Sequence, residues 1–283
     1  MIPATFDYIR AGSVEEAVSA LTEHGDEAKL LAGGHSLLPL MKLRLASPEV
    51  LIDLGRVDAL RGVCELDDGR LSIGAMTAHQ DVIDNDLVRQ HCGVLADVTR
   101  QVGDAQVRHR GTIGGALAHG DAASDLPAAL LALDGTVVVQ GPSGQREIAA
   151  ADLFVDYLAT SISDDEVITE VRVPKFDGSW GWNYQKFGRV AQAWAIVGSL
   201  GLVKRSNGNV EEARVGLTHM GTVPLRATAV EQALAGAAID GIADAAEHAA
   251  EGTSAPTDLN ATSEFREHLA RVLTKRALQA AAG

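Results

Sequence analysis

Two pairs of adjacent glycines, Gly33-Gly34 and Gly114-Gly115, are the residues in this sequence best suited to binding an anionic group. Glycines adopt positive φ and leave no Cβ over a turn, so successive N–H groups can surround an anion. A phosphate is further favoured where a helix begins. One such pair is typical of a connecting turn. Two loops that converge in one domain could clamp a pyrophosphate, with the hydroxyls of Ser36 and Thr112 as added donors.

Other nucleotide motifs are absent from the sequence. No GxxxxGK[ST] occurs, and no GxGxxG follows an expected strand, which excludes a P-loop and disfavours a dinucleotide site of the Rossmann type. The segment Gly34-His35-Ser36 resembles the start of a GxSxG nucleophile elbow, but Leu38 occupies the place of its second glycine. A serine hydrolase that uses Ser36 therefore stays as a less favoured alternative.

Three polar residues, His119, Asp125 and Lys186, could contribute to a metal-binding or cofactor-binding site. His119, with Asp121 and Asp125 nearby, could ligate a metal, although a loop histidine near one carboxylate is more often simply hydrogen-bonded. Asp125 could accept from a ribose hydroxyl or cap the helix that follows. Lys186, on an expected strand, could bring positive charge to a flavin ring, or it could be a surface lysine. We predict no metal site and no catalytic residue.

Composition limits the class of protein. The 283 residues include 38 acidic and 24 basic ones, a net charge of −14, which argues against a nucleic-acid surface. Cys64 and Cys92 lack CxxC spacing, so they cannot hold an iron–sulfur cluster alone, and they fit a reducing compartment. The N-terminus lacks a signal pattern and no apolar run has membrane-spanning length, so we expect a cytoplasmic chain.

The elements that must position these residues follow from periodicity and capping. A capping box at Ser13–Glu16 predicts a helix to His24, and residues 29–45 predict a strand, a glycine turn and a short helix. We expect residues 103–125 to be an irregular, functional loop. Further strands are expected at 50–53, 62–65, 71–73, 136–140 and 167–173. Thr77 can cap a helix that runs through Val82, and further helices are expected over 91–102 and up to Leu133.

The composition changes near Pro174. Three strands are expected at 181–187, 194–204 and 210–220, and Asn207-Gly208 predicts a hairpin between the last two. Helices are expected near 226–236, 239–251 and 263–281. These elements predict an antiparallel sheet with helices on one side, and an α+β protein as a whole.

Two longer segments, taken in order, carry a family resemblance. AGGHSLLPLMKLRLA at 32–46 and GTIGGALAHGDAASDLPA at 111–128 resemble the FAD-binding medium subunits of molybdenum hydroxylases, the xanthine dehydrogenase family. Within it, the first 36 residues are most similar to the aerobic carbon monoxide dehydrogenase type. The resemblance implies a PCMH or vanillyl-alcohol-oxidase type FAD-binding domain over 1–176 and a CO dehydrogenase flavoprotein C-terminal domain over 177–283.

The resemblance also implies a function. FAD, held without a covalent bond, would pass electrons from a small subunit with [2Fe–2S] clusters to a quinone-type or other acceptor, and a large subunit would carry the molybdenum cofactor. It implies a dimer of heterotrimers and allows peripheral membrane association of the complex. Alternatives are the FAD subunit of a xanthine, aldehyde or N-heterocycle dehydrogenase, and an assembly subunit that has lost its flavin.

Position by position, the resemblance marks a set of cofactor-binding residues. Ile168 and Lys186 match positions beside the isoalloxazine ring, and Asp125 matches an acidic position of the family. Ala116 replaces an asparagine, and Arg189-Val190 replaces an acidic-aromatic pair beside the flavin, so the acceptor is not specified. The complete set is Ala32, Gly33, Gly34, His35, Ser36, Leu37, Gly111, Thr112, Ile113, Gly114, Gly115, Ala118, Asp125, Ile168 and Lys186.

Overall fold

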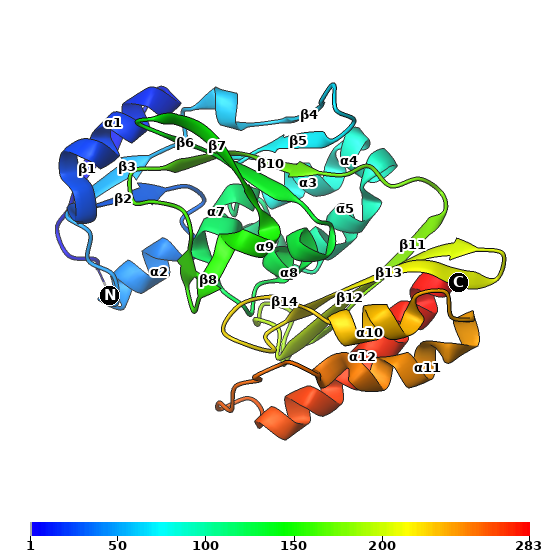
Figure 1. Cartoon of the computed structure of the whole chain (residues 1–283). Helices are drawn as coiled ribbons and strands as arrows, with labels where there is room; N and C mark the ends of the chain where they lie inside the picture. The colour runs from blue at the N-terminus through cyan, green and yellow to red at the C-terminus, as the bar shows by residue number, and fades with distance from the viewer. Residues whose placement is uncertain (1) are drawn as a thin grey trace.

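The computed structural model describes residues 2–283 (Figure 1). Its first sheet is parallel, in the order β1-β3-β2, and is built from β1 (Asp7–Arg10), β2 (Ala28–Leu31) and β3 (Val50–Asp53). Helix α1 (Val14–His24) connects β1 to β2, and Ser13 Oγ accepts from the Glu16 N–H at its start. The predicted strand, turn and short helix are confirmed as β2, a turn and α2 (Leu37–Lys42).

The second sheet is antiparallel and has the order β4-β5-β10-β6-β7. The predicted strands are confirmed. The sequence did not predict β7, because this edge strand is mostly exposed and polar. The strands are β4 (Val63–Glu65), β5 (Leu71–Gly74), β6 (Thr136–Gly141), β7 (Gly144–Ala149) and β10 (Val167–Val173).

The helices that follow differ from the prediction at their ends. The first, α3 (His79–Asp84), starts two residues after Thr77, whose hydroxyl instead pairs with the backbone N–H and C=O of Gly62. The prediction that Thr77 caps this helix is therefore wrong. Helix α4 (Asp86–His91) precedes α5 (Gly93–Arg100), which is the core of the helix expected over 91–102.

Residues 103–125 contain two short helices and the start of a third, so the prediction of an irregular loop is wrong for about half of this range. They contain α6 (Ala105–Arg108) and α7 (Ile113–His119), and α8 (Asp125–Ala132) begins at their end. The glycines that suggested a loop lie inside α7. A Cβ at Gly114 would lie 2.5 Å from the Cβ of Ala75, so close packing, not a turn, requires this glycine. The sheet is followed by α9 (Ala150–Leu153) and the small pair β8 (Phe154–Asp156) and β9 (Ala159–Thr160).

The C-terminal region is a four-stranded antiparallel sheet with helices. Asn207 and Gly208 both have positive φ, 53° and 81°, which confirms the predicted hairpin between β12 and β13. No helix in residues 2–283 combines the length and apolar character needed to cross a bilayer. The elements are β11 (Trp180–Phe187), β12 (Val197–Ser206), β13 (Asn209–Thr218), β14 (Leu225–Arg226), α10 (Thr228–Leu234), α11 (Ile242–Ala245) and α12 (Ser263–Ala282).

Both faces of this sheet are covered. Helix α12 packs on one face, where a Cβ at Gly201 would lie 3.1 Å from the Leu278 backbone. Helix α8 packs on the other, where a Cβ at Gly216 would lie 2.5 Å from the Ala128 carbonyl oxygen (Figure 1). The prediction of helices on one side is thus correct for the C-terminal helices alone. The architecture as a whole is α+β, as predicted.

Candidate functional site

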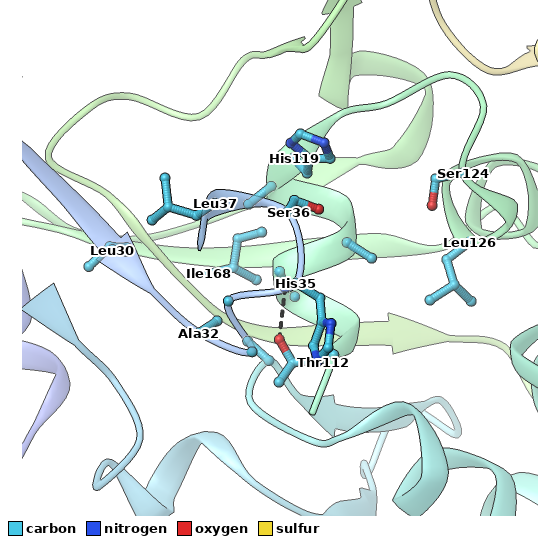
Figure 2. A pocket seen from close by; sticks show the side chains of 18 of the residues that line it. Leu30, Ala32, His35, Ser36, Leu37, Thr112, His119, Ser124, Leu126 and Ile168 are labelled. Carbon is cyan, nitrogen blue, oxygen red and sulfur yellow. Dashed lines mark hydrogen bonds between the residues drawn. The ribbon is translucent and has the colours of Figure 1, made fainter. Parts of the chain in front are cut away.

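A cavity of about 570 Å³ lies among the parallel sheet, the antiparallel sheet and strand β11. This volume is in the range of small-molecule and cofactor sites. Figure 2 shows labelled side chains from the first glycine segment (residues 32–46) and the second glycine segment (residues 111–128), together with Ile168 of β10, around the same space. Every residue of the predicted set lines the cavity except Ile113. The Ile113 side chain is instead 2% exposed and belongs to the hydrophobic core.

The first glycine segment carries free backbone donors. After β2 ends at Leu31, Gly34 takes a φ of +75°, and its carbonyl accepts from the Leu38 N–H at 3.0 Å. Within residues 2–283 no acceptor pairs with the backbone N–H of any residue from Gly33 to Leu37. All five of these residues line the cavity, so five successive donors are available to an anionic ligand.

The second glycine segment, unlike the first, has few free backbone donors. The N–H groups of Ile113 and Gly114 donate to the carbonyls of Thr77 and Ala75 at 3.1 and 2.9 Å, and the Gly115 N–H donates to Thr112 Oγ1 at 3.2 Å. These three donors are therefore already used, and the hypothesis of two equivalent donor loops needs correction. The Thr112 hydroxyl, which accepts from Gly115, keeps its own proton to donate.

The two segments touch at Gly33. A Cβ at this position would lie 2.8 Å from Gly111 Cα and would also overlap the carbonyl oxygen of Arg110. Real Cβ atoms do not approach backbone this closely, so only glycine lets the first segment rest on the second. Gly33 is thus required by packing between the loops, while Gly34 is the residue that needs the positive φ.

A buried ion pair closes one side of the cavity. Asp125 is 4% exposed and accepts from Lys186 Nζ at 2.7 Å and from the Tyr184 hydroxyl at 2.6 Å. Burial raises the pKa of Asp125, and the positive charge of Lys186 opposes that rise. The surface alternative for Lys186 is wrong, since its side chain is 12% exposed and lines the cavity. The capping alternative for Asp125 is also wrong, because α8 starts at Asp125 itself and its N-cap is Ser124.

His79 also lines this cavity, and sequence reasoning missed it. The side chain lies beside Gly111, and its Nδ1 has no hydrogen-bond partner in residues 2–283. Burial, with smaller effects from His35 and Arg108, lowers the pKa of His79 to about 4. The imidazole is therefore neutral at neutral pH.

Protonation of His79 should destabilise the fold in acid. Its folded pKa of about 4 lies below the unfolded value near 6.5, so the unfolded chain binds more protons between them. The contribution of neutral His79 to the free energy of unfolding is complete above about pH 6.5 and is lost as the pH falls toward 4. Between pH 7 and pH 5 we expect wild type to lose ~2 kcal/mol more unfolding free energy than His79→Gln, measured by urea denaturation. Equal losses in the two proteins would contradict this role of His79.

Other residues of the cavity carry no sequence motif. His119 and Trp194 face each other with ring centroids 6.5 Å apart, and residues around Thr160 and Ile162 form part of the wall. Residues 2–283 contain no group of three or more His, Cys, Asp or Glu side chains that could hold a metal ion. Ser36 Oγ is hydrogen-bonded to no base within the described chain, so nothing there activates it as a nucleophile.

Comparisons with known proteins agree with this geometry. Residues 4–176 match the family model described as the FAD binding domain in molybdopterin dehydrogenase, and residues 182–281 match the CO dehydrogenase flavoprotein C-terminal domain. The carbon monoxide dehydrogenase medium chain of Hydrogenophaga pseudoflava is 39% identical, over 99% of this chain and 98% of the relative. The glyceraldehyde dehydrogenase medium chain of Sulfolobus acidocaldarius is 34% identical, over 99% of both chains.

The structural comparison is equally close. A solved structure of carbon monoxide dehydrogenase from Hydrogenophaga pseudoflava, which lacks the Mo-pyranopterin moiety of its cofactor, matches with a TM-score of 0.96 and 41% identity. The match covers 99% of this chain and 98% of the other. The chain therefore belongs to the FAD-binding medium subunits of the molybdenum hydroxylase family, the family that includes the carbon monoxide dehydrogenase medium chains.

Proposed function

We propose that this chain holds FAD in the main cavity and relays electrons to an external acceptor within a molybdenum hydroxylase complex. The observation that supports this most is the run of five free N–H groups over Gly33–Leu37, which suits the diphosphate of FAD. The Thr112 hydroxyl adds a donor. Lys186 of β11 lines the same cavity.

The chain's own residues have binding and electrostatic roles. When bound, FAD accepts electrons one at a time and gives them up in pairs. Lys186 places the positive end of its ion pair with Asp125 on the cavity wall, and positive charge there favours electron-rich forms of the ring system. Ile168, from the bulged part of β10, adds apolar surface that excludes water from the same region. No residue of this chain needs to move a proton.

The electrons must come from a partner. Cys92 is buried and Cys64 is exposed, and two separated cysteines cannot hold a [2Fe–2S] cluster. We propose that a small subunit carries such clusters and a large subunit carries the molybdenum cofactor, assembled as a dimer of heterotrimers in the cytoplasm. The higher identity to the carbon monoxide dehydrogenase medium chain than to the glyceraldehyde dehydrogenase one favours a CO dehydrogenase-like complex with a quinone-type acceptor.

A flavin assay tests the first part of this proposal. The purified chain should be yellow, with about one FAD released per chain on heat denaturation, because no covalent link is proposed. A colourless protein that takes up no FAD would exclude the proposal. The complex isolated from its native cell would then be assayed with CO, aldehydes and N-heterocycles, and with quinone and NAD as acceptors, to identify substrate and acceptor.

A further inference from the structure

A second cavity, of about 380 Å³, adjoins the main one, and four of its twelve lining residues are arginines. The two cavities share Ala32, Gly33, Met76 and Thr112, so the glycine segments border both. We call the second cavity the arginine pocket. Its wall contains four arginines and a histidine that come from β1, the turn after β3, the loop before β4 and the two residues after α6. They are Arg10, Arg56, Arg61, Arg110 and His109.

The positive charge of the arginine pocket is only partly neutralised by the chain. Asp53 is its one acidic lining residue, and the Asp53 carboxylate already accepts from the Tyr8 hydroxyl and from the Gly55 N–H at 2.7 Å. Arg10 lies 3.9 Å from it. In residues 2–283 neither Arg56 nor Arg110 forms an ion pair. Unpaired arginines are notable in a chain with a net charge of −14.

One arginine of the pocket is held in a fixed orientation. Arg61 donates from Nη1 to the Met76 carbonyl at 3.1 Å and from Nη2 to the Gly55 carbonyl at 3.3 Å. Carbonyl groups orient a guanidinium without cancelling its charge, and a fixed guanidinium loses less entropy when it binds an oxyanion. Guanidinium groups match carboxylate and phosphate oxygens in paired, charge-assisted hydrogen bonds. The arrangement is therefore suited to a compact anion with several oxygens.

We propose that the arginine pocket is a phosphate-binding site, separate from the FAD cavity, and that Arg56, Arg61 and Arg110 are its main ligands. The occupant is a phosphate group, either as free phosphate or as part of a nucleotide. A bound phosphate would rest against the backbone at Gly33, which also borders the main cavity, so the two sites share one wall. This site goes beyond the electron-relay function, and its test rests on the proposed FAD binding only in that bound FAD keeps phosphate out of the main cavity.

Isothermal titration of the full chain with inorganic phosphate tests the site. The protein is saturated with FAD, so that phosphate cannot enter the main cavity. We expect saturable one-to-one binding that weakens at least tenfold in Arg56→Gln with Arg110→Gln and falls steeply with salt. Arg89→Gln, an exposed arginine on α4 that lies outside the pocket, is the matched control and should bind phosphate like wild type.

Each outcome decides the proposal. Tighter binding of ADP than of phosphate supports a nucleotide as the occupant, and equal binding supports free phosphate. Binding that persists in the double variant, or that occurs in the FAD-free protein alone, overturns the arginine pocket as the site, as does no binding at all. Arg56→Gln alone removes no side-chain hydrogen bond or ion pair within residues 2–283, so it keeps the test valid if the double variant loses its fold.

Discussion

Replacing Gly33 by alanine should weaken FAD binding by roughly ten- to a hundredfold. The new methyl group would meet the carbonyl of Arg110 and the Cα of Gly111, and both are backbone atoms that cannot rotate away. The two glycine segments must then separate. Overpacking of this kind costs about 1–3 kcal/mol, and each 1.4 kcal/mol is tenfold in affinity. Fluorescence titration of FAD into the apoprotein measures the change.

Gly178→Ala is the matched control for this variant. A Cβ at Gly178 meets no atom within 4 Å, so the same chemical change carries no steric cost there. We expect FAD affinity in Gly178→Ala to equal that of wild type. If Gly33→Ala also binds FAD like wild type while remaining folded, the N–H groups of residues 33–37 are not the groups that hold the cofactor.

Replacing Lys186 by methionine should destabilise the protein by about 3–5 kcal/mol, the typical cost of leaving one charge of a buried pair unpaired. Asp125 is buried in a site that already raises the pKa of its carboxyl, and Lys186 is the cation that opposes this rise. Without the lysine, the pKa of Asp125 should rise further, and the variant should be least stable at high pH. Urea denaturation at pH 6 and pH 9 measures both effects.

A double variant separates the charge from the side-chain volume. Lys186→Met with Asp125→Asn removes both charges and keeps similar shapes, so it should recover most of the lost stability. A loss below about 1 kcal/mol in Lys186→Met would show that the pair behaves like a solvent-exposed salt bridge. In the FAD-loaded variant the midpoint potential of the flavin should also fall, because a positive charge on the cavity wall has been removed.

The parts of the fold that local sequence signals determine were predicted well. The capping serine at Ser13, the Asn207-Gly208 turn and the apolar runs of β3 and β10 each depend on residues within one element. Such signals act over a few residues, so they can be recognised without knowing what packs against them. The family resemblance, and not spacing alone, indicated which residues line the cavity.

The rest depends on contacts between distant residues. The glycines of α7 were interpreted as a loop because nothing in the sequence shows Ala75 pressed against them. Lys186 and Asp125 are 61 positions apart, and the arginine pocket collects side chains from four segments. His79 carries no motif at all, and its perturbed pKa arises from burial. Tertiary packing decides all of these features, and a single sequence does not record it.

Strand β12 has a further consequence for how the molecule holds together. Leu200 and Leu202 belong to the core formed with the FAD-binding segment, whereas Val203 belongs to the core beneath the C-terminal helices. Because β12 contributes to both cores, unfolding of one core should destabilise the other. We therefore do not expect the chain to unfold first at the boundary between the two family segments. A chain cut near residue 176 would bare an apolar surface on α8 and leave Asp125 without its lysine. We therefore expect the two segments to unfold as one cooperative unit.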